Sequence, residues 1–168
     1  MLTGMWSIMG LNKMRKILSC IFIVAWMGLI FKLSSQPAVQ SGKLSGRVTN
    51  INIKAIEKVN PSTKFNIAEF NHMVRKNAHF FVYLVLGVLT INALRIKGIR
   101  RYRCVIFALF ICILYASSDE VHQIFVPGRS AQVKDVFIDS AGAGVGILVY
   151  LIIGKFRASS SQRGQTLM

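Results

Sequence analysis

The sequence predicts an all-α, polytopic membrane protein: a bundle of four transmembrane helices with both termini in the cytoplasm. Hydrophobic residues make up 53% of the 168 residues and charged residues only 16%, whereas soluble domains average about 25% charged. The apolar residues are concentrated in four runs, Ile17–Leu33, Ala78–Leu94, Cys104–Ser118 and Val136–Ile153. The Lys and Arg residues between these runs are unevenly distributed, and this distribution orients the bundle.

Each run holds about 15–18 residues, slightly fewer than the ~20 that a helix needs to cross about 30 Å of hydrocarbon. Polar residues next to the runs must therefore lie at membrane depth. The first run follows Lys13, Arg15 and Lys16, as the apolar part of a signal peptide would. The Ser-Ser-Gln-Pro after it contains no small-x-small cleavage site, so we expect this run to remain as the first span.

The basic residues predict which loops are cytoplasmic. Residues 1–16, 95–103 and 154–168 hold 11 of the 21 Lys and Arg in 40 positions, while 34–77 and 119–135 hold 9 in 61. The positive-inside rule places the first group in the cytoplasm. We therefore expect a basic N-terminus over 1–16, a membrane domain over 17–153, and a basic, Ser-rich, disordered tail over 154–168.

The net charge of +15 does not indicate a nucleic-acid partner, because no basic patch is interleaved with aromatic residues. Cys20, Cys104 and Cys112 all lie within apolar runs. Cys104 and Cys112 are separated by about 12 Å along one helix, too far for a disulfide. We expect the cysteines to be small buried hydrophobic residues.

The segment 34–77, the extracytoplasmic loop, begins rich in Ser, Pro and Gly. Val48, Ile51, Ile56 and Val59 fit helical spacing loosely, which is consistent with a short amphipathic helix on the outer membrane surface. An irregular surface loop fits the same residues nearly as well.

A stripe of basic, imidazole and phenol side chains leads into the second span. Helical spacing places four side chains of this segment on one side: His72, Lys76, His79 and Tyr83. Arg75 neighbours the stripe, four residues before His79.

The third span ends in YASSDEVHQIF, which carries two polar faces. By the same spacing, one face holds Tyr115, Ser118, Asp119 and His122, and another holds Glu120 and Gln123. The VPGR that follows predicts a tight turn, because Pro127 presets φ and Gly128 can take the positive φ of a type II turn. The fourth span then begins with Asp135 and Asp139 one turn apart.

These polar groups converge on one extracytoplasmic rim, with more ionisable groups than four helix ends require. Asp139 lies one turn deeper, where an ionised carboxylate costs about 2.5–3.5 kcal/mol. It needs a partner, and those within reach are Arg75, Arg129, His79 and His122.

The pattern VRKNAHFFVYLVLG, followed by SSDEVHQIFVPGRSAQVKDVFIDSAGAGVG, resembles the VanZ-like family of membrane proteins. The matching residues are Arg75, Lys76, His79, Tyr83, Gly87, Ser118, Asp119, Glu120, His122, Gln123, Phe125, Pro127, Gly128, Arg129, Asp135, Asp139 and Gly142. The resemblance covers about 34–153 and implies a small four-helix protein of bacterial envelopes. The founding member of the family is associated with low-level resistance to teicoplanin, so the resemblance implies a setting more than a reaction.

One functional hypothesis is binding of an anionic envelope lipid, a lipid-linked cell-wall intermediate or a lipoglycopeptide. Arg75, Lys76 and Arg129 would contact the anion, since the guanidinium fork suits phosphate and carboxylate. Asp119 and Asp139 would orient these cations. The expected binding residues are Arg75, Lys76, Gln123, Arg129, Asp135 and Asp139.

An enzymatic hypothesis assigns the general acid and base to four residues: His79, Asp119, Glu120 and His122. With two Arg nearby, the reaction class would be phosphoryl or acyl transfer on a lipid-linked substrate. A third hypothesis is a purely structural network with Arg75–Asp139 or Arg129–Asp119 ion pairs.

We expect no metal and no cofactor. His79, His122 and the acidic residues are suitable ligand types, but Asp-Glu-Val-His lacks the spacing of a familiar zinc motif. Any metal site would have to be assembled across helices. No Gly-rich nucleotide loop occurs either.

Four short spans without an internal repeat argue against a secondary transporter. Gly142 and Gly146 form a small-xxx-small pattern, which lets another helix approach closely. These glycines fit either a homo-oligomer or packing of the fourth span within one bundle, so the oligomeric state stays open.

Overall fold

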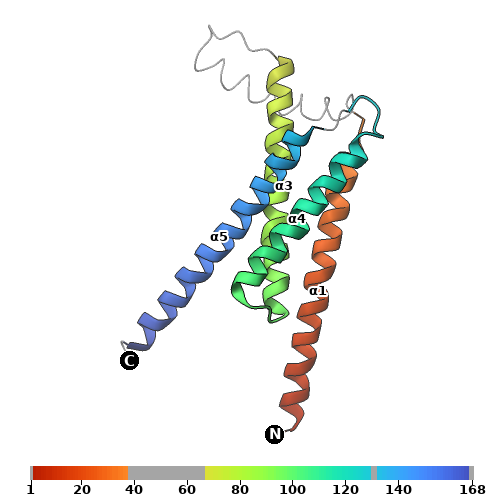
Figure 1. Ribbon diagram of the computed structural model, residues 1–168. Coiled ribbons are helices and arrows are strands. Elements are labelled where there is room, and N and C mark those ends of the chain that lie inside the picture. The colour runs from red at the N-terminus through yellow and green to blue at the C-terminus, as the bar shows by residue number, and fades with distance from the viewer. Residues whose placement is uncertain (1, 38–66, 130–131, 167–168) are drawn as a thin grey trace.

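The computed structural model describes residues 2–37, 67–129 and 132–166, which form four α-helices and no strand (Figure 1). The helices are α1 (Leu2–Ser34), α3 (Ile67–Ile96), α4 (Arg101–Gln123) and α5 (Val133–Thr166). Each contains a stretch of 22 to 25 residues that is long and apolar enough to cross a membrane. The predicted all-α fold with four candidate spans is confirmed. The amphipathic helix considered for 48–59 lies outside the described residues.

The outward-facing surface of the helices is apolar, as expected of a protein embedded in lipid. Phe22 is 63% exposed, Ile106 60% and Phe137 72%, and many other large hydrophobic side chains face outward beside them. The buried core is small by comparison. A soluble monomer rarely exposes apolar surface on this scale.

Helix α3 occupies the centre of the arrangement and packs against α1, α4 and α5. Both termini lie at one end of the molecule, and the connection between α4 and α5 lies at the other (Figure 1). We call the latter the turn end. At the opposite end, α3 is followed by Gly98 with φ of 85°, and Ile99 N–H donates to the carbonyl of Leu94. This C-terminal glycine motif lets the chain reverse into α4.

Glycines allow α3 and α5 to pack backbone against backbone. A Cβ placed on Gly142 would collide with the carbonyl of Phe80, and one on Gly146 with the carbonyl of Leu84. On the facing helix, a Cβ on Gly87 would collide with the carbonyl of Ala143. Gly142 and Gly146 therefore allow the predicted close approach between α5 and α3 of the same chain. Helix α3 covers the glycine face of α5.

Polar side chains join the helices inside the apolar region. Trp26 Nε1 on α1 donates to the Val82 carbonyl on α3 at 2.9 Å, and Tyr115 on α4 donates to the Met27 carbonyl on α1 at 2.5 Å. Cys104 and Cys112 are buried and free, as expected. The hydrogen bonds of Trp26 and Tyr115 help to hold the helices together, because lipid supplies no hydrophobic force between helices.

The helices extend beyond the apolar runs that predicted them. Helix α5 continues to Thr166, so the tail expected to be disordered over 154–168 is helical as far as that residue. The segment after Ile153 contains no proline, and its Ala, Gln, Arg and Lys residues are compatible with a helix. The polar ends of α3 and α4 likewise remain helical, which carries the predicted polar residues on regular helix faces.

Candidate functional site

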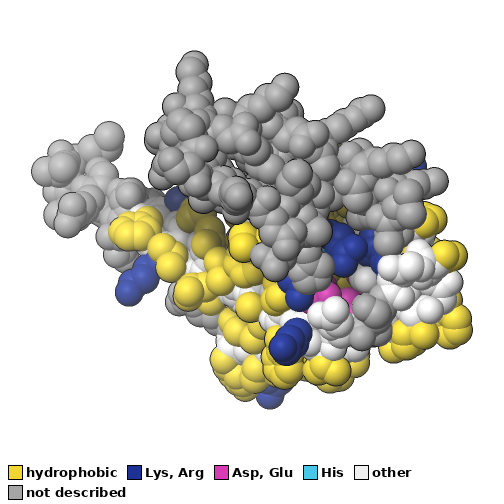
Figure 2. All heavy atoms as spheres, turned by 90° about the horizontal axis from the view of Figure 1, so that it is seen from above, with side chains coloured by type: hydrophobic (Ala, Val, Ile, Leu, Met, Phe, Trp, Pro, Cys, Tyr) yellow, Lys and Arg dark blue, Asp and Glu magenta, His cyan; other side chains and the backbone are white. Residues whose placement is uncertain are grey.

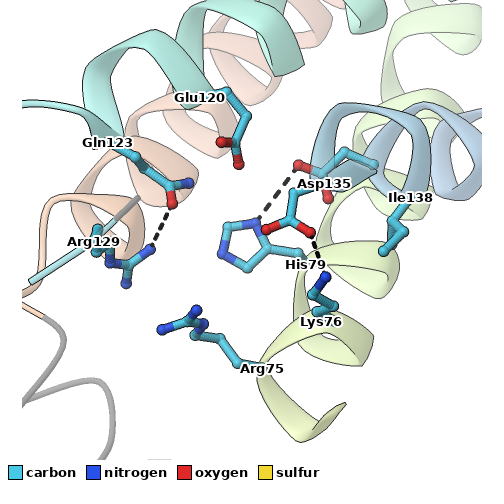
Figure 3. Close-up of a pocket in the computed structure, with 9 residues that line it drawn as sticks. Arg75, Lys76, His79, Glu120, Gln123, Arg129, Asp135 and Ile138 are labelled. Atoms are coloured by element: carbon cyan, nitrogen blue, oxygen red, sulfur yellow. Dashed lines mark hydrogen bonds and ion pairs between the residues drawn. The ribbon is translucent and has the colours of Figure 1, made fainter. Parts of the chain in front are cut away.

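A small pocket opens at the turn end, between α3, α4 and α5. Its lining is mostly polar: Arg75, Lys76, His79, Glu120, Gln123, Arg129, Asp135, Ile138 and Asp139 (Figure 3). The free volume of about 10 Å³ is room for about one water molecule or ion. Seen from above, basic and acidic side chains gather at one place with hydrophobic side chains around them (Figure 2). The structure therefore brings eight of the ten predicted residues around one pocket.

The turn that carries Arg129 has the predicted form. The N–H of Arg129 donates to the carbonyl of Val126 at 3.1 Å, and Gly128 has φ of 76°. Proline at the second position and positive φ at the third are the signature of a type II turn. The turn directs the Arg129 side chain back toward α1.

Arg129 donates hydrogen bonds to backbone carbonyls at the end of α1. Its Nε donates to the Gln36 carbonyl at 3.0 Å, and a terminal nitrogen donates to the Leu33 carbonyl at 3.3 Å. The last carbonyls of a helix lack intrahelical partners, and a cation there also complements the helix dipole. Burial, then the nearby Arg75, lower the pKa of Arg129 below its ordinary value. A guanidinium still stays charged at neutral pH.

Asp119 is linked to Arg129 through Gln123. The hydroxyl of Ser34 donates to Asp119 Oδ2 at 2.6 Å, and Gln123 Nε2 donates to the same oxygen at 3.3 Å. The amide oxygen of Gln123 in turn accepts from Arg129 at 3.2 Å. Asp119 is only 3% exposed, and its Oδ1 is buried without a hydrogen bond.

Two further contacts secure the start of α5. Glu120 accepts a hydrogen bond from the backbone N–H of Gln132 at 2.9 Å, directly before the helix begins. Lys76 on α3 forms a 2.8 Å ion pair with Asp135 in the first turn of α5. An acidic residue in the first turn complements the helix dipole.

Asp139 is the most deeply buried acidic group of the pocket, at 1% exposure. Of the four partners that the sequence allowed, His79 is the one found, with its Nδ1 at 3.7 Å from Asp139 Oδ2. This distance is too long for a hydrogen bond, and both carboxylate oxygens are buried without one. His79, Asp119 and Asp139 each offer an atom that lies within 4.8 Å of the other two.

Arg75 points into the pocket toward Arg129 (Figure 3). It is partly buried, and among the described residues it forms neither a hydrogen bond nor an ion pair. The Arg75–Asp139 and Arg129–Asp119 ion pairs considered from the sequence are likewise not formed. Arg75 is thus a cation facing a second cation across a pocket.

His122 does not line the pocket. It faces α1, where its Nε2 lies 3.1 Å from Ser35 Oγ and its ring packs on Phe31 at 4.3 Å between centroids. Tyr115, Asp119 and His122 share one face, as predicted, and this face meets α1, but Ser118 is exposed. Successive helical residues point about 100° apart, so Ser118 and Asp119 cannot both face the same neighbour.

Residues 19–154, most of the chain, match the model of the VanZ/LLP1 family. This chain belongs to the VanZ/LLP1 family. No curated protein and no solved structure matches it. The match includes two candidate membrane helices in full and most of the other two, so the chain is a VanZ-like multi-pass membrane protein.

Sequence reasoning missed two polar groups of this VanZ-family site. Ser34 ends α1 fully buried and holds Asp119. A polar residue at the end of an apolar run, at membrane depth, was the signal that could have identified it. Tyr83 was assigned to the polar stripe but not to the site, and its hydroxyl is buried with no hydrogen bond in the described chain.

Proposed function

We propose that this VanZ-family protein binds the anionic group of an envelope molecule in the pocket at the turn end. The ligand classes are an anionic lipid headgroup, a lipid-linked cell-wall intermediate and a lipoglycopeptide such as teicoplanin. In this proposal the turn end is extracytoplasmic and both termini are cytoplasmic, as the distribution of Lys and Arg favours.

The observation that carries the proposal is the guanidinium of Arg75, which has no hydrogen bond or ion pair to any residue that the structure describes. A cation at membrane depth normally pairs with an acid or a carbonyl. Arg75 instead faces Arg129, whose remaining two N–H groups are not used by Leu33, Gln36 or Gln123. A phosphate or carboxylate between the two guanidinium groups would neutralise their repulsion and accept hydrogen bonds from both.

The position of Arg75 supports an amphiphilic ligand. It lies within the first turn of the apolar stretch Met73–Ile96, close to the depth at which lipid headgroups meet hydrocarbon. Helices α3 and α5, which carry the pocket, also present exposed apolar side chains to the surroundings, among them Met73 and Phe137. An acyl or prenyl chain would follow this surface while its charged group reached the pocket.

A purely structural role accounts for part of the polar cluster. Arg129, Glu120 and the Lys76–Asp135 pair all connect helix ends. It does not account for Arg75 or for the Asp139 carboxylate, which lack hydrogen bonds within the described residues.

The enzymatic alternative is favoured by one observation, the proximity of His79 to Asp139 beside the two Arg residues. A histidine held by a carboxylate is a suitable general base. His122 would have no part in it. Turnover of a lipid-linked phosphate by the purified protein, lost in His79→Ala, would replace the binding proposal with the enzymatic one.

The binding test uses purified full-length protein and native mass spectrometry with equal amounts of three probes. They are a neutral phosphatidylcholine, an anionic phosphatidylglycerol and undecaprenyl phosphate. Retention of one or both anionic lipids over the neutral one is expected. Equal retention of all three would contradict an anion site.

The antibiotic ligand is tested by growth. A Gram-positive host that expresses the chain is compared with one carrying an empty vector across a teicoplanin series. Protection that disappears in Arg75→Gln, at equal expression, assigns the pocket to glycopeptide resistance. Absence of protection by the unmodified chain would remove the lipoglycopeptide from the ligand classes and leave the two lipids.

A further inference from the structure

Next to the pocket, one imidazole and two carboxylates from three different helices lie close together; His79 and Asp139 also line the pocket, whereas Asp119 does not. His79 comes from α3, Asp119 from α4 and Asp139 from α5, and one atom of each lies within 4.8 Å of the others. This is an assembly across helices, which no spacing within one segment of the sequence could reveal.

The unsatisfied oxygens indicate that something is held there. Asp139 is 1% exposed with both oxygens unpaired, and Asp119 is 3% exposed with Oδ1 unpaired. Buried polar atoms almost always have a partner. Two ionised carboxylates this close repel one another strongly where water is scarce. A positive charge between the two carboxylates would give the unpaired oxygens a partner and would also offset the repulsion.

The side chains of the described residues place little positive charge beside the carboxylates of Asp119 and Asp139. Lys76 is engaged by Asp135 at 2.8 Å, and Arg129 by the Leu33 and Gln36 carbonyls. Arg75 lines the pocket as well, but neither it nor Lys76 nor Arg129 forms an ion pair with Asp119 or Asp139. His79 alone approaches, at 3.7 Å from Asp139.

The separations suit a shared metal ion better than a hydrogen bond. Zinc bonds to His and carboxylate are about 2.0–2.2 Å long, so neighbouring ligands of a tetrahedral ion lie about 3.3–3.5 Å apart. The His79–Asp139 distance of 3.7 Å is close to this value, and a carboxylate oxygen of Asp119 lies within 4.8 Å of both groups. Oδ2 of Asp119 is held by Ser34 and Gln123, as expected of a carboxylate ligand with hydrogen bonds behind it.

We infer that His79, Asp119 and Asp139 form a binding site for one divalent transition-metal ion, with Zn²⁺ as the best fit to one nitrogen and two oxygen ligands. Three protein ligands leave one position open toward the pocket, as in zinc sites that exchange a water or an external ligand. The site also fastens α3, α4 and α5 to one another at the turn end. This inference does not rest on the proposed function, because it concerns metal binding with no lipid or antibiotic present.

The test measures metal content and thermal unfolding of the full-length chain in detergent, purified with a tag that contains no histidine. Protein is loaded with Zn²⁺, dialysed, and analysed by mass spectrometry for metals. About one zinc per chain is expected. Zinc at about 100 times its Kd should raise the unfolding temperature by about 5–10 °C over the chelated protein.

Matched variants separate this site from the surrounding charges. His79→Ala and Asp139→Asn should lose the zinc and the temperature rise. His122→Ala and Asp135→Asn remove an imidazole and a carboxylate that are not among the three ligands. Both variants should keep the zinc and the temperature rise. Asp139→Asn should also unfold at a higher temperature than the unmodified chain when both are free of metal, because it removes the carboxylate repulsion.

Zinc below about 0.1 per chain after loading, with no rise in the unfolding temperature, would overturn the inference and assign the unpaired oxygens to a proton or a water. A temperature rise that persists in both His79→Ala and Asp139→Asn would overturn it as well, since zinc would then bind elsewhere. Metal content and unfolding temperature are both measured without any anionic ligand, so their outcome does not depend on the binding proposal.

Discussion

Ser34 and Asp119 connect the end of α1 to α4 through a 2.6 Å hydrogen bond between two side chains that are almost fully buried. Helix α1 also contacts α4 through the Tyr115–Met27 hydrogen bond and the Phe31–His122 ring contact. Among these contacts, the Ser34 hydroxyl is the one that holds a buried carboxylate.

Ser34→Ala should destabilise the protein by about 1–3 kcal/mol, because Asp119 loses a donor in a place that water does not reach. Thermal unfolding in detergent measures the change. Ser19→Ala is the control, since Ser19 is only partly buried on the same helix and bonds to the Lys16 carbonyl one turn earlier. Equal unfolding temperatures for the two variants would contradict the importance of the Ser34–Asp119 contact.

Gly146→Ala should disrupt packing of α3 against α5, because the added Cβ would collide with the carbonyl of Leu84. Overpacking against backbone costs about 1–3 kcal/mol or more. Gly28→Ala is the opposite case, since nothing lies within 4 Å of its added Cβ. In α1 that change should be neutral or stabilise by up to about 1 kcal/mol. Parallel unfolding curves of the two variants test the contrast, and similar losses would show that the α3–α5 contact is not close.

Arg129→Lys should loosen the end of α1 although it keeps the charge. One ammonium group cannot reproduce the hydrogen bonds that the guanidinium donates in different directions to Leu33, Gln36 and Gln123. We expect a loss of about 1–3 kcal/mol in unfolding measurements. Arg103→Lys, at an exposed site in α4, should stay within about 0.5 kcal/mol of the unmodified chain. If Arg129→Lys matches Arg103→Lys, the guanidinium geometry is unimportant.

The sequence was sufficient for the four spans and for the turn. Long apolar runs leave a membrane helix as the only simple solution, because each backbone N–H and C=O must be paired within the segment. The turn was predictable because Pro127 and Gly128 restrict φ locally. The helix ends were not, since the backbone hydrogen bonds of α5 continue into a polar segment that hydropathy does not describe.

The site was predictable as a group of residues but not as a set of contacts. Helical spacing correctly placed Glu120 with Gln123 and Tyr115 with Asp119. Spacing cannot say which neighbouring helix covers a face, so the position of His122 against α1 could not be foreseen. The partners of Arg129 include backbone carbonyls, which have no sequence signature. The proximity of His79, Asp119 and Asp139 depends on how three helices cross, and only the structure contains that information.

The contact of Arg75 with an anion in this pocket is tested most directly by lipid retention of Arg75→Gln in native mass spectrometry. Arg103→Gln removes the same charge from the opposite end of the bundle and serves as the control. We expect retention of the anionic probe to fall at least about tenfold in Arg75→Gln, equivalent to about 1.4 kcal/mol, and to stay unchanged in Arg103→Gln. Unchanged retention by a folded Arg75→Gln variant, or an equal loss in both variants, would contradict this contact.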